Sequence, residues 1–183
     1  EAPDTASNRE SIALKYKLIN QGGSPTTTGW YDHIYISKFS TFNANTATHL
    51  GQYYRNNLQN DDTLICSQTV VIPDKTAGLQ YLFVFTNKEK YQFEGSNDTN
   101  NLSPPFPIRI LNPDLTVRHV IVPAADSSGK PMRIDWVVMN EGPGKHVTQS
   151  RKDKIFISRH SVFHADSCLL VDSVVYNLAL NAG

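Results

Sequence analysis

The chain has 183 residues, which is enough for one or two domains with a buried core. Its 17 basic and 17 acidic side chains cancel, so nucleic acid, which requires a basic excess or patch, is not an expected partner. The sequence holds no run of about 18 apolar residues, so no helical membrane span is expected. Ten glycines and ten prolines interrupt it, which is typical of short strands joined by turns.

A strand is predicted first between residues 12 and 18. Apolar residues occupy alternate positions there, with Lys15 and Lys17 between them. This period of two places one face on a core and the other in water. No segment shows a helical period, so we expect an all-β fold. Further strands in the first half are expected at Asp32–Ser37, His49–Tyr54, Thr63–Ile72, Gln80–Thr86 and Pro107–Ile110.

Three blocks of the sequence recur in the same order, offset by roughly 120 residues, a period that indicates tandem domains. A solenoid would instead repeat every 20–50 residues or so. The later blocks are residues 126–142, Asp153–Ser158 and Phe163–Ala165, and they echo residues 7–22, Asp32–Ser37 and Phe42–Ala44. The block at residues 126–142 predicts a strand at Met132–Val138, because apolar residues again occupy alternate positions there.

The boundary between the two units is expected near the proline-rich segment Leu102–Pro107, because such a stretch makes a stiff, extended crossing. We therefore expect modules at residues 1–110 and 111–183. The first would lack its opening strand, and the second would be truncated before its last strands. A partial sandwich exposes an apolar face and unpaired edges, so neighbouring sequence or a partner is expected to complete it.

Four segments in combination resemble the CARDB family, the cell-adhesion-related domain found in bacteria. They are Trp30–Ser37, Glu94–Asn101, Pro113–Val117 and Trp136–Gly142. The resemblance covers nearly the whole chain. It implies tandem Ig-like (fibronectin III-like) antiparallel β-sandwiches, the second one incomplete, of the kind found in large bacterial surface and secreted proteins.

The sequence departs from the family pattern in two places. Arg151 and Lys152 stand in the second unit where the first has Trp30 and Tyr31, so only one unit can use the aromatic pair. The loop 37–50 carries asparagines at positions 43 and 45, where family members often carry acids. This weakens a calcium interpretation of that loop.

No motif for catalysis is present, so we expect no enzyme and no catalytic residue. The sequence has neither a nucleophile elbow nor a phosphate-binding glycine loop. His160 and His164 are four residues apart, but on strands and loops that spacing has no special meaning, and no further Cys or His pair completes a zinc set.

Calcium is the one cofactor for which the sequence offers candidates. Asp32, Glu94, Asn97 and Asp98 could supply oxygen ligands if their turns converge. Asn and Asp also bend and cap turns without any metal, and we favour that interpretation. No cofactor is therefore expected.

Trp30 and Tyr31 are the candidate binding residues. Together with Tyr53 and Tyr54 they could form a stacking platform for a sugar. Alternate members could instead fill the core, and we favour this. Adjacent residues of a strand point to opposite faces, so no more than half of the four can face outward.

The two cysteines, Cys66 and Cys168, lie in different parts of the chain. Two unpaired thiols are the favoured interpretation, and a single bridge is the alternative.

Two hypotheses for function follow. The first is a non-catalytic structural or adhesive module of a large bacterial surface or secreted multidomain protein. Its partners would be other domains of the same chain or another surface protein, outside the cell. The alternative is an accessory glycan-binding module of a secreted polysaccharide-degrading enzyme, binding through Trp30 and its neighbours. A glycan is thus a possible partner, and nucleic acid and a direct membrane span are not expected.

Overall fold

The computed structural model describes residues 1–146 and 150–182, and these form strands joined by turns and two short 3₁₀ segments. The predicted all-β fold is confirmed. No helix in the described residues is long and apolar enough to cross a membrane. The strands are β1 (Thr5–Ser7), β2 (Ser11–Ile19), β3 (Trp30–Ser37), β4 (Thr48–Arg55), β5 (Thr63–Val71), β6 (Gly78–Thr86), β7 (Phe106–Leu111), β8 (Leu115–Ile121), β9 (Asp135–Asn140), β10 (Arg151–Ser158) and β11 (Cys168–Tyr176).

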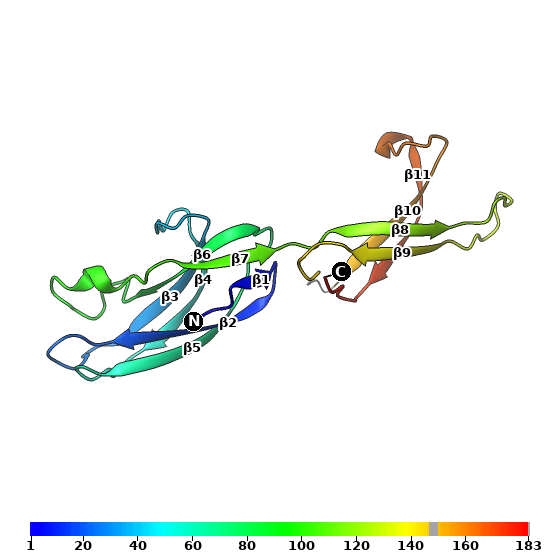
Figure 1. Cartoon of the computed structure of the whole chain (residues 1–183). Coiled ribbons are helices and arrows are strands. Elements are labelled where there is room, and N and C mark those ends of the chain that lie inside the picture. The colour runs from blue at the N-terminus through cyan, green and yellow to red at the C-terminus, as the bar shows by residue number, and fades with distance from the viewer. Residues whose placement is uncertain (147–149, 183) are drawn as a thin grey trace.

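Strands β1 to β7 build a two-layer sandwich. One layer is a five-stranded sheet in the order β1-β7-β6-β3-β4, and the other is the pair β2-β5. Figure 1 shows these strands as one elongated body in blue to green. The pairs are antiparallel, as expected, except for the short parallel pair β1-β7.

The core of this sandwich lies between the two layers. Ile12 and Leu14 of β2 point inward and meet Ile34 and Ile36 of β3, because each strand contributes every second residue. Ile34 is 0% exposed. The alternation read from the sequence at residues 12–18 therefore has the predicted role.

Strands β8 to β11 form the second part of the chain, which Figure 1 shows beyond the segment that follows β7. They make two separate antiparallel ribbons, β8-β9 and β10-β11. Many of their large apolar side chains are exposed. They include Leu115, Val117, Val120, Ile121, Val137, Met139, Ile157, Leu169, Leu170, Val171 and Val175.

The two parts touch at a short joint. The backbone N–H of Lys145 donates to the Ser7 hydroxyl at 2.9 Å, and the Lys145 ammonium lies 3.4 Å from Glu10. Two glycines permit a close approach of backbones here. A Cβ on Gly142 would fall 2.6 Å from the carbonyl oxygen of Asn112, and one on Gly144 would fall 2.7 Å from the Asn112 nitrogen.

The strand predictions differ from the structure in a few places. Residues 132–134 were expected in a strand, but β9 begins only at Asp135. The three-residue β1 and the strand β11 were not predicted. The two cysteines are free, with Cys66 buried in β5 and Cys168 at the start of β11, so the bridge alternative is wrong.

Candidate functional site

The two candidate binding residues lie on opposite sides of the five-stranded sheet. Trp30 is 4% exposed and points between the two layers, whereas Tyr31 is half-buried on the outer face. Tyr53 packs against the core, and Tyr54 is 56% exposed. The four aromatic residues therefore do not form one platform. The expectation that no more than half of them face outward agrees with this arrangement.

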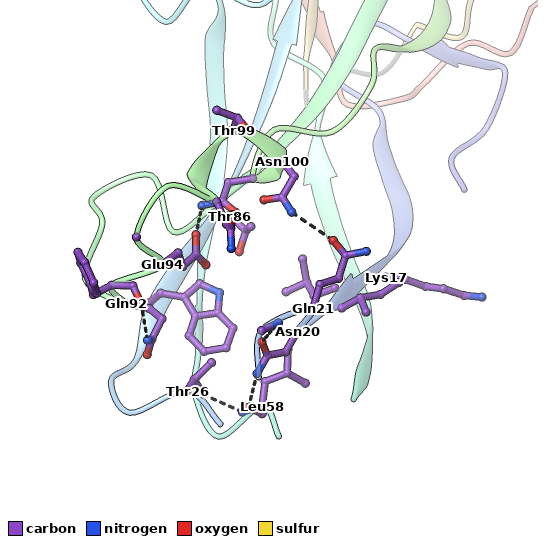
Figure 2. A pocket seen from close by; sticks show the side chains of 18 of the residues that line it. Lys17, Asn20, Gln21, Thr26, Leu58, Thr86, Gln92, Glu94, Thr99 and Asn100 are labelled. Carbon is purple, nitrogen blue, oxygen red and sulfur yellow. Dashed lines mark hydrogen bonds between the residues drawn. The ribbon is translucent and has the colours of Figure 1, made fainter. Parts of the chain in front are cut away.

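Trp30 forms part of a cavity of about 840 Å³ at the end of the first sandwich. Figure 2 shows its lining, which comes from β2, β6 and the loops at residues 20–26 and 92–103. Leu58 and Val84 supply apolar walls, and Phe93 stands at the edge, 86% exposed.

Several polar groups that line this cavity are hydrogen-bonded to one another. The Asn101 amide donates to the Glu94 carboxylate at 2.6 Å, and the Asn100 amide donates to the Gln21 side chain at 3.2 Å. Figure 2 shows the second bond spanning the space between Asn100 and Gln21, which lies in the turn after β2. Asn20 donates to the backbone carbonyl of Ser24. These bonds hold the loops in place and occupy groups that a ligand would otherwise use.

The four calcium candidates are not brought together. The Asp32 side chain is fully buried and accepts hydrogen bonds from Tyr16, Arg55 and Thr86 at 2.7–2.9 Å. Asp98 is paired with Lys90 on the surface. Among residues 1–146 and 150–182, no group of three or more His, Cys, Asp or Glu is placed to hold a metal ion.

Asp32 instead links the two layers of the sandwich. Its partners Tyr16, Arg55 and Thr86 come from β2, β4 and β6. Burial and the neighbouring Asp32 charge raise the pKa of the Tyr16 hydroxyl, so this group stays a donor to the carboxylate. The Arg55 guanidinium also donates to the Tyr16 oxygen at 3.1 Å. The network is structural: every oxygen of the buried carboxylate is satisfied.

The second part holds a matching contact. The Trp136 indole N–H donates to Asp153 at 2.8 Å, as Tyr16 donates to Asp32. Arg151, which stands where the first part has Trp30, also donates to Asp153, at 2.9 Å. Thus one carboxylate in each part is held by a side chain of the facing ribbon, although its partners differ.

The outer face of β3 and β4 carries a cluster of aromatic and histidine side chains. Three tyrosines, Tyr31, Tyr54 and Tyr91, form what we call the outer tyrosine group. The Tyr31 ring lies 5.5 Å from that of Tyr54 and 6.5 Å from that of Tyr91, both edge-on. The absence of a side chain at Gly29 lets the Tyr54 ring lie against the backbone there.

His33 lies next to this group and makes two polar contacts. Its Nδ1 is 3.1 Å from Nε2 of His49, and its Nε2 is 2.8 Å from a carboxylate oxygen of Glu89. The Glu89 contact is at ion-pair distance without the alignment of a hydrogen bond. His33 is only 6% exposed, whereas His49 is exposed.

The surroundings of His49 favour its neutral form. Its pKa is lowered, because the ring is partly desolvated and because it faces His33 and the Lys88 ammonium. That ammonium donates to the Tyr35 hydroxyl at 2.9 Å, a bond that raises the pKa of Lys88. A neutral imidazole offers one nitrogen lone pair to a ligand.

Sequence reasoning missed this cluster. His33 and Tyr31 share a face because they are two residues apart, which the strand period does predict. His49 joins them through pairing of β3 with β4, in which a bulge sets Tyr35 opposite His49. Tyr91 and Glu89 come from the loop that follows β6, whose path no local pattern reveals.

The geometry defines the class of the protein: an all-β chain with a closed first sandwich and an open second part. Comparisons with known proteins do not assign the chain to a family. No family model matches the chain, and no curated protein matches it.

Several solved structures are similar at low identity. The CARDB domain of a Pyrococcus furiosus protein, described as in complex with di-metal ions, matches 60% of this chain and 82% of its own, with 15% identity and a TM-score of 0.46. A β-glucosidase from Listeria innocua, in complex with gluconolactone, matches 60% of this chain and 15% of its own, with 10% identity and a TM-score of 0.39.

A third similar structure is a chaperone–tip adhesin complex of CFA/I fimbriae biogenesis. It covers 98% of this chain and 80% of its own, with 12% identity and a TM-score of 0.26. With TM-scores under 0.5, these similarities assign neither a family nor a ligand to this chain.

Proposed function

We propose that this chain is a non-catalytic structural module with an adhesive role, part of a large bacterial surface or secreted multidomain protein. The observation that carries the proposal is the open second part, which exposes apolar side chains on two ribbons that belong to separate sheets. Soluble proteins rarely expose contiguous apolar patches of this kind unless something covers them. The module is therefore built to assemble with further β-structure.

The first part indicates what covers these ribbons. There, β2 pairs with β5, and β3 pairs with β6 as well as β4. The strand β9 corresponds in sequence to β2, and β10 corresponds to β3. In the described residues, β9 pairs only with β8 and β10 only with β11. The outer edges of β9 and β10 are thus free, and a free edge is a template for strand addition.

We infer that two further strands of the same polypeptide, with the alternating pattern of β5 and β6, cover these edges and close the second unit. This makes residues 1–110 and 111–183 two successive modules of one array. Matching contacts support the inference. The Asn20 side chain accepts from Gly22 and donates to Ser24, and the Asn140 side chain does the same with Gly142 and Gly144.

The experiment supplies the missing strands. Residues 60–111 are fused after Gly183, because they contain β5, β6 and β7. Hydrogen exchange in Asp135–Asn140 and Arg151–Ser158 and binding of the dye ANS are then compared with those of the chain alone. We expect slower exchange and weaker dye binding in the fusion.

Two outcomes contradict the proposal. If the chain alone is a monomer that binds little dye and protects β9 and β10 fully, its second part is already closed. If light scattering shows a dimer with the same protection, a second copy covers the ribbons. A fusion in which the order of residues 60–111 is scrambled serves as the control for added length.

Glycan binding is the second candidate function, and the outer tyrosine group favours it. Tyr54 and Tyr91 are both more than half exposed and lie beside Tyr31. Exposed aromatic rings with a polar tip are suited to sugar stacking. The test is retention of the chain on insoluble cellulose and chitin. Loss in Tyr54→Ala but not in Phe93→Ala would assign binding to this face, and no retention would remove the candidate.

A further inference from the structure

The histidine pair on the outer face has an arrangement that its role in folding does not require. His33 and His49 come from neighbouring strands, and their ring centroids are 5.2 Å apart. Nδ1 of His33 and Nε2 of His49 point at each other across 3.1 Å. Two imidazoles in this position share one proton, or they share another cation.

Glu89 decides which nitrogen of His33 is free. Its carboxylate lies 2.8 Å from Nε2, so the proton belongs on Nε2, because two acceptors at that distance would repel each other. Nδ1 of the neutral ring then carries a lone pair that points at His49. A carboxylate beside one ring nitrogen leaves the other nitrogen of the imidazole for a metal ion, although the Glu89 contact has the distance and not the alignment of a hydrogen bond.

The separation of the two nitrogens also suits a metal ion. For metal–nitrogen bonds of about 2.0–2.1 Å, two ligands at a right angle are about 2.9 Å apart, and two at the tetrahedral angle about 3.4 Å apart. The observed 3.1 Å lies between these values. The two nitrogens are therefore close enough to share one ion once the rings tilt so that both lone pairs converge on it, and the exposed His49 ring is open to solvent on one side.

We propose that Nδ1 of His33 and Nε2 of His49 form a two-histidine site for a divalent transition-metal ion of the Zn²⁺, Ni²⁺ and Cu²⁺ class, with Glu89 orienting His33. Imidazole is a preferred ligand of these ions. His49 is exposed, so an ion can reach its ring from solvent. With two protein ligands, water fills the other positions, and the ion exchanges readily. This proposal is independent of the assembly proposed above.

The Lys88 ammonium is the feature that opposes an ion here. It lies close enough to lower the pKa of His49 and is held over the Tyr35 ring, 5.4 Å from the centroid. Its charge weakens binding of any cation, so removing it is a direct probe. We expect Lys88→Gln to bind the metal more tightly than the unaltered chain.

The test is a titration of the full chain, freed of metal with a chelator, with ZnCl₂ at pH 7.5. Long-range ¹⁵N spectra of the histidine rings report which nitrogens bind. We expect Nδ1 of His33 and Nε2 of His49 to shift together, at one ion per chain. Binding should weaken at least tenfold at pH 5.5, because protons compete for the same lone pairs.

Variants separate this site from the other four histidines. His49→Ala should abolish the shift of His33, and Glu89→Gln should weaken binding by about 10–100-fold, as expected of a group that orients a metal ligand. The double variant His160→Ala/His164→Ala is the matched control and should bind as the unaltered chain does. Since His49 is exposed, its replacement should leave the fold intact, which circular dichroism checks.

The proposal is overturned if His33 and His49 do not shift up to millimolar Zn²⁺, or if the shifts occur at His160 and His164 instead. It is also overturned if His49→Ala keeps its fold and still binds with unchanged affinity. The spectra of the unaltered chain alone decide the first point, so the outcome does not depend on any variant folding.

Discussion

The strand pairs β3-β4 and β10-β11 share a pairing pattern, yet β3 is largely buried and β10 is not. In β3-β4 a bulge falls between Ile34 and Tyr35, and in β10-β11 one falls between Ile155 and Phe156. Ile34 is fully buried, whereas Ile155 is only partly buried. Strand pairing is therefore encoded within each ribbon, whereas the burial of its side chains depends on the layer that faces it.

A fluorescent reporter is available in each part. The chain has two tryptophans. Trp30 lies in the first part and Trp136 in the second. Replacing Trp136 with Phe leaves a probe of the first part, and replacing Trp30 leaves a probe of the second. Urea unfolding of such single-tryptophan chains measures the stability of each part separately.

The largest effect is expected at Asp32. Replacing it with Ala leaves the Arg55 guanidinium without its carboxylate inside the sandwich, which should cost about 3–5 kcal/mol of unfolding free energy. Asp153→Ala, the matched change in the second part, should cost less because the Asp153 carboxylate is 16% exposed, whereas that of Asp32 is 0% exposed. Equal losses in the two variants would mean that both carboxylates are enclosed to the same degree.

The next effect concerns apolar burial at corresponding positions. Ile34→Ala should cost about 2–5 kcal/mol, since a fully buried Ile leaves a cavity. Ile155→Ala should cost less, about 1–2 kcal/mol, because its side chain is only partly buried. Urea unfolding measures both. If Ile155→Ala proves as costly as Ile34→Ala, the second part has a covered core in solution.

A smaller effect is expected at the glycines of the two matching turns. Gly142→Ala should lose about 1–3 kcal/mol, because the new Cβ meets the backbone of residues 112–114. At Gly22 the nearest atom is the Asn20 side-chain oxygen at 3.1 Å, which needs to move only slightly. We therefore expect Gly22→Ala to be close to neutral. Thermal unfolding of the two variants tests this, and equal shifts would contradict it.

The smallest effect is the pH dependence that His49 contributes to the stability of the first part. The pKa of His49 is lowered from 6.5, so the unfolded chain binds a proton more readily than the folded one. This contribution to stability is present above about pH 6.5 and is lost as the pH falls through the folded value. In the presence of a metal chelator, His49→Gln should reduce the loss of unfolding free energy that accompanies the fall in pH. An unchanged pH profile in this variant would show that His49 is not the group responsible.

Local patterns predicted the strands well where a partner strand is present. The alternation at residues 12–18 is realised in β2, which pairs along its length with β5. The same alternation at residues 132–134 lies outside β9, where no ladder contact holds it. An alternating sequence pattern predicts which residues share a face. A strand forms, however, only where the segment pairs with another strand.

The site could be predicted only in part. Period two placed Trp30 and Tyr31 on opposite faces, but which of them enters the sandwich depends on the layer packed against β3. Asp32 was considered as a turn residue or calcium ligand, because its partners Tyr16 and Arg55 come from other strands. The approach of His49 to His33 depends on the register of two strands, which 15 intervening residues leave open.

The joint between the two parts has a mechanical consequence. Backbones meet there without intervening side chains at Gly142 and Gly144, and Lys145 ties the second part to Ser7 and Glu10. A joint packed this closely resists bending between the two parts. A row of modules joined this way would lengthen in proportion to their number, whereas a row on flexible linkers would grow only as the square root. The small residues at the joint would thus help set how far from a surface such a protein can reach.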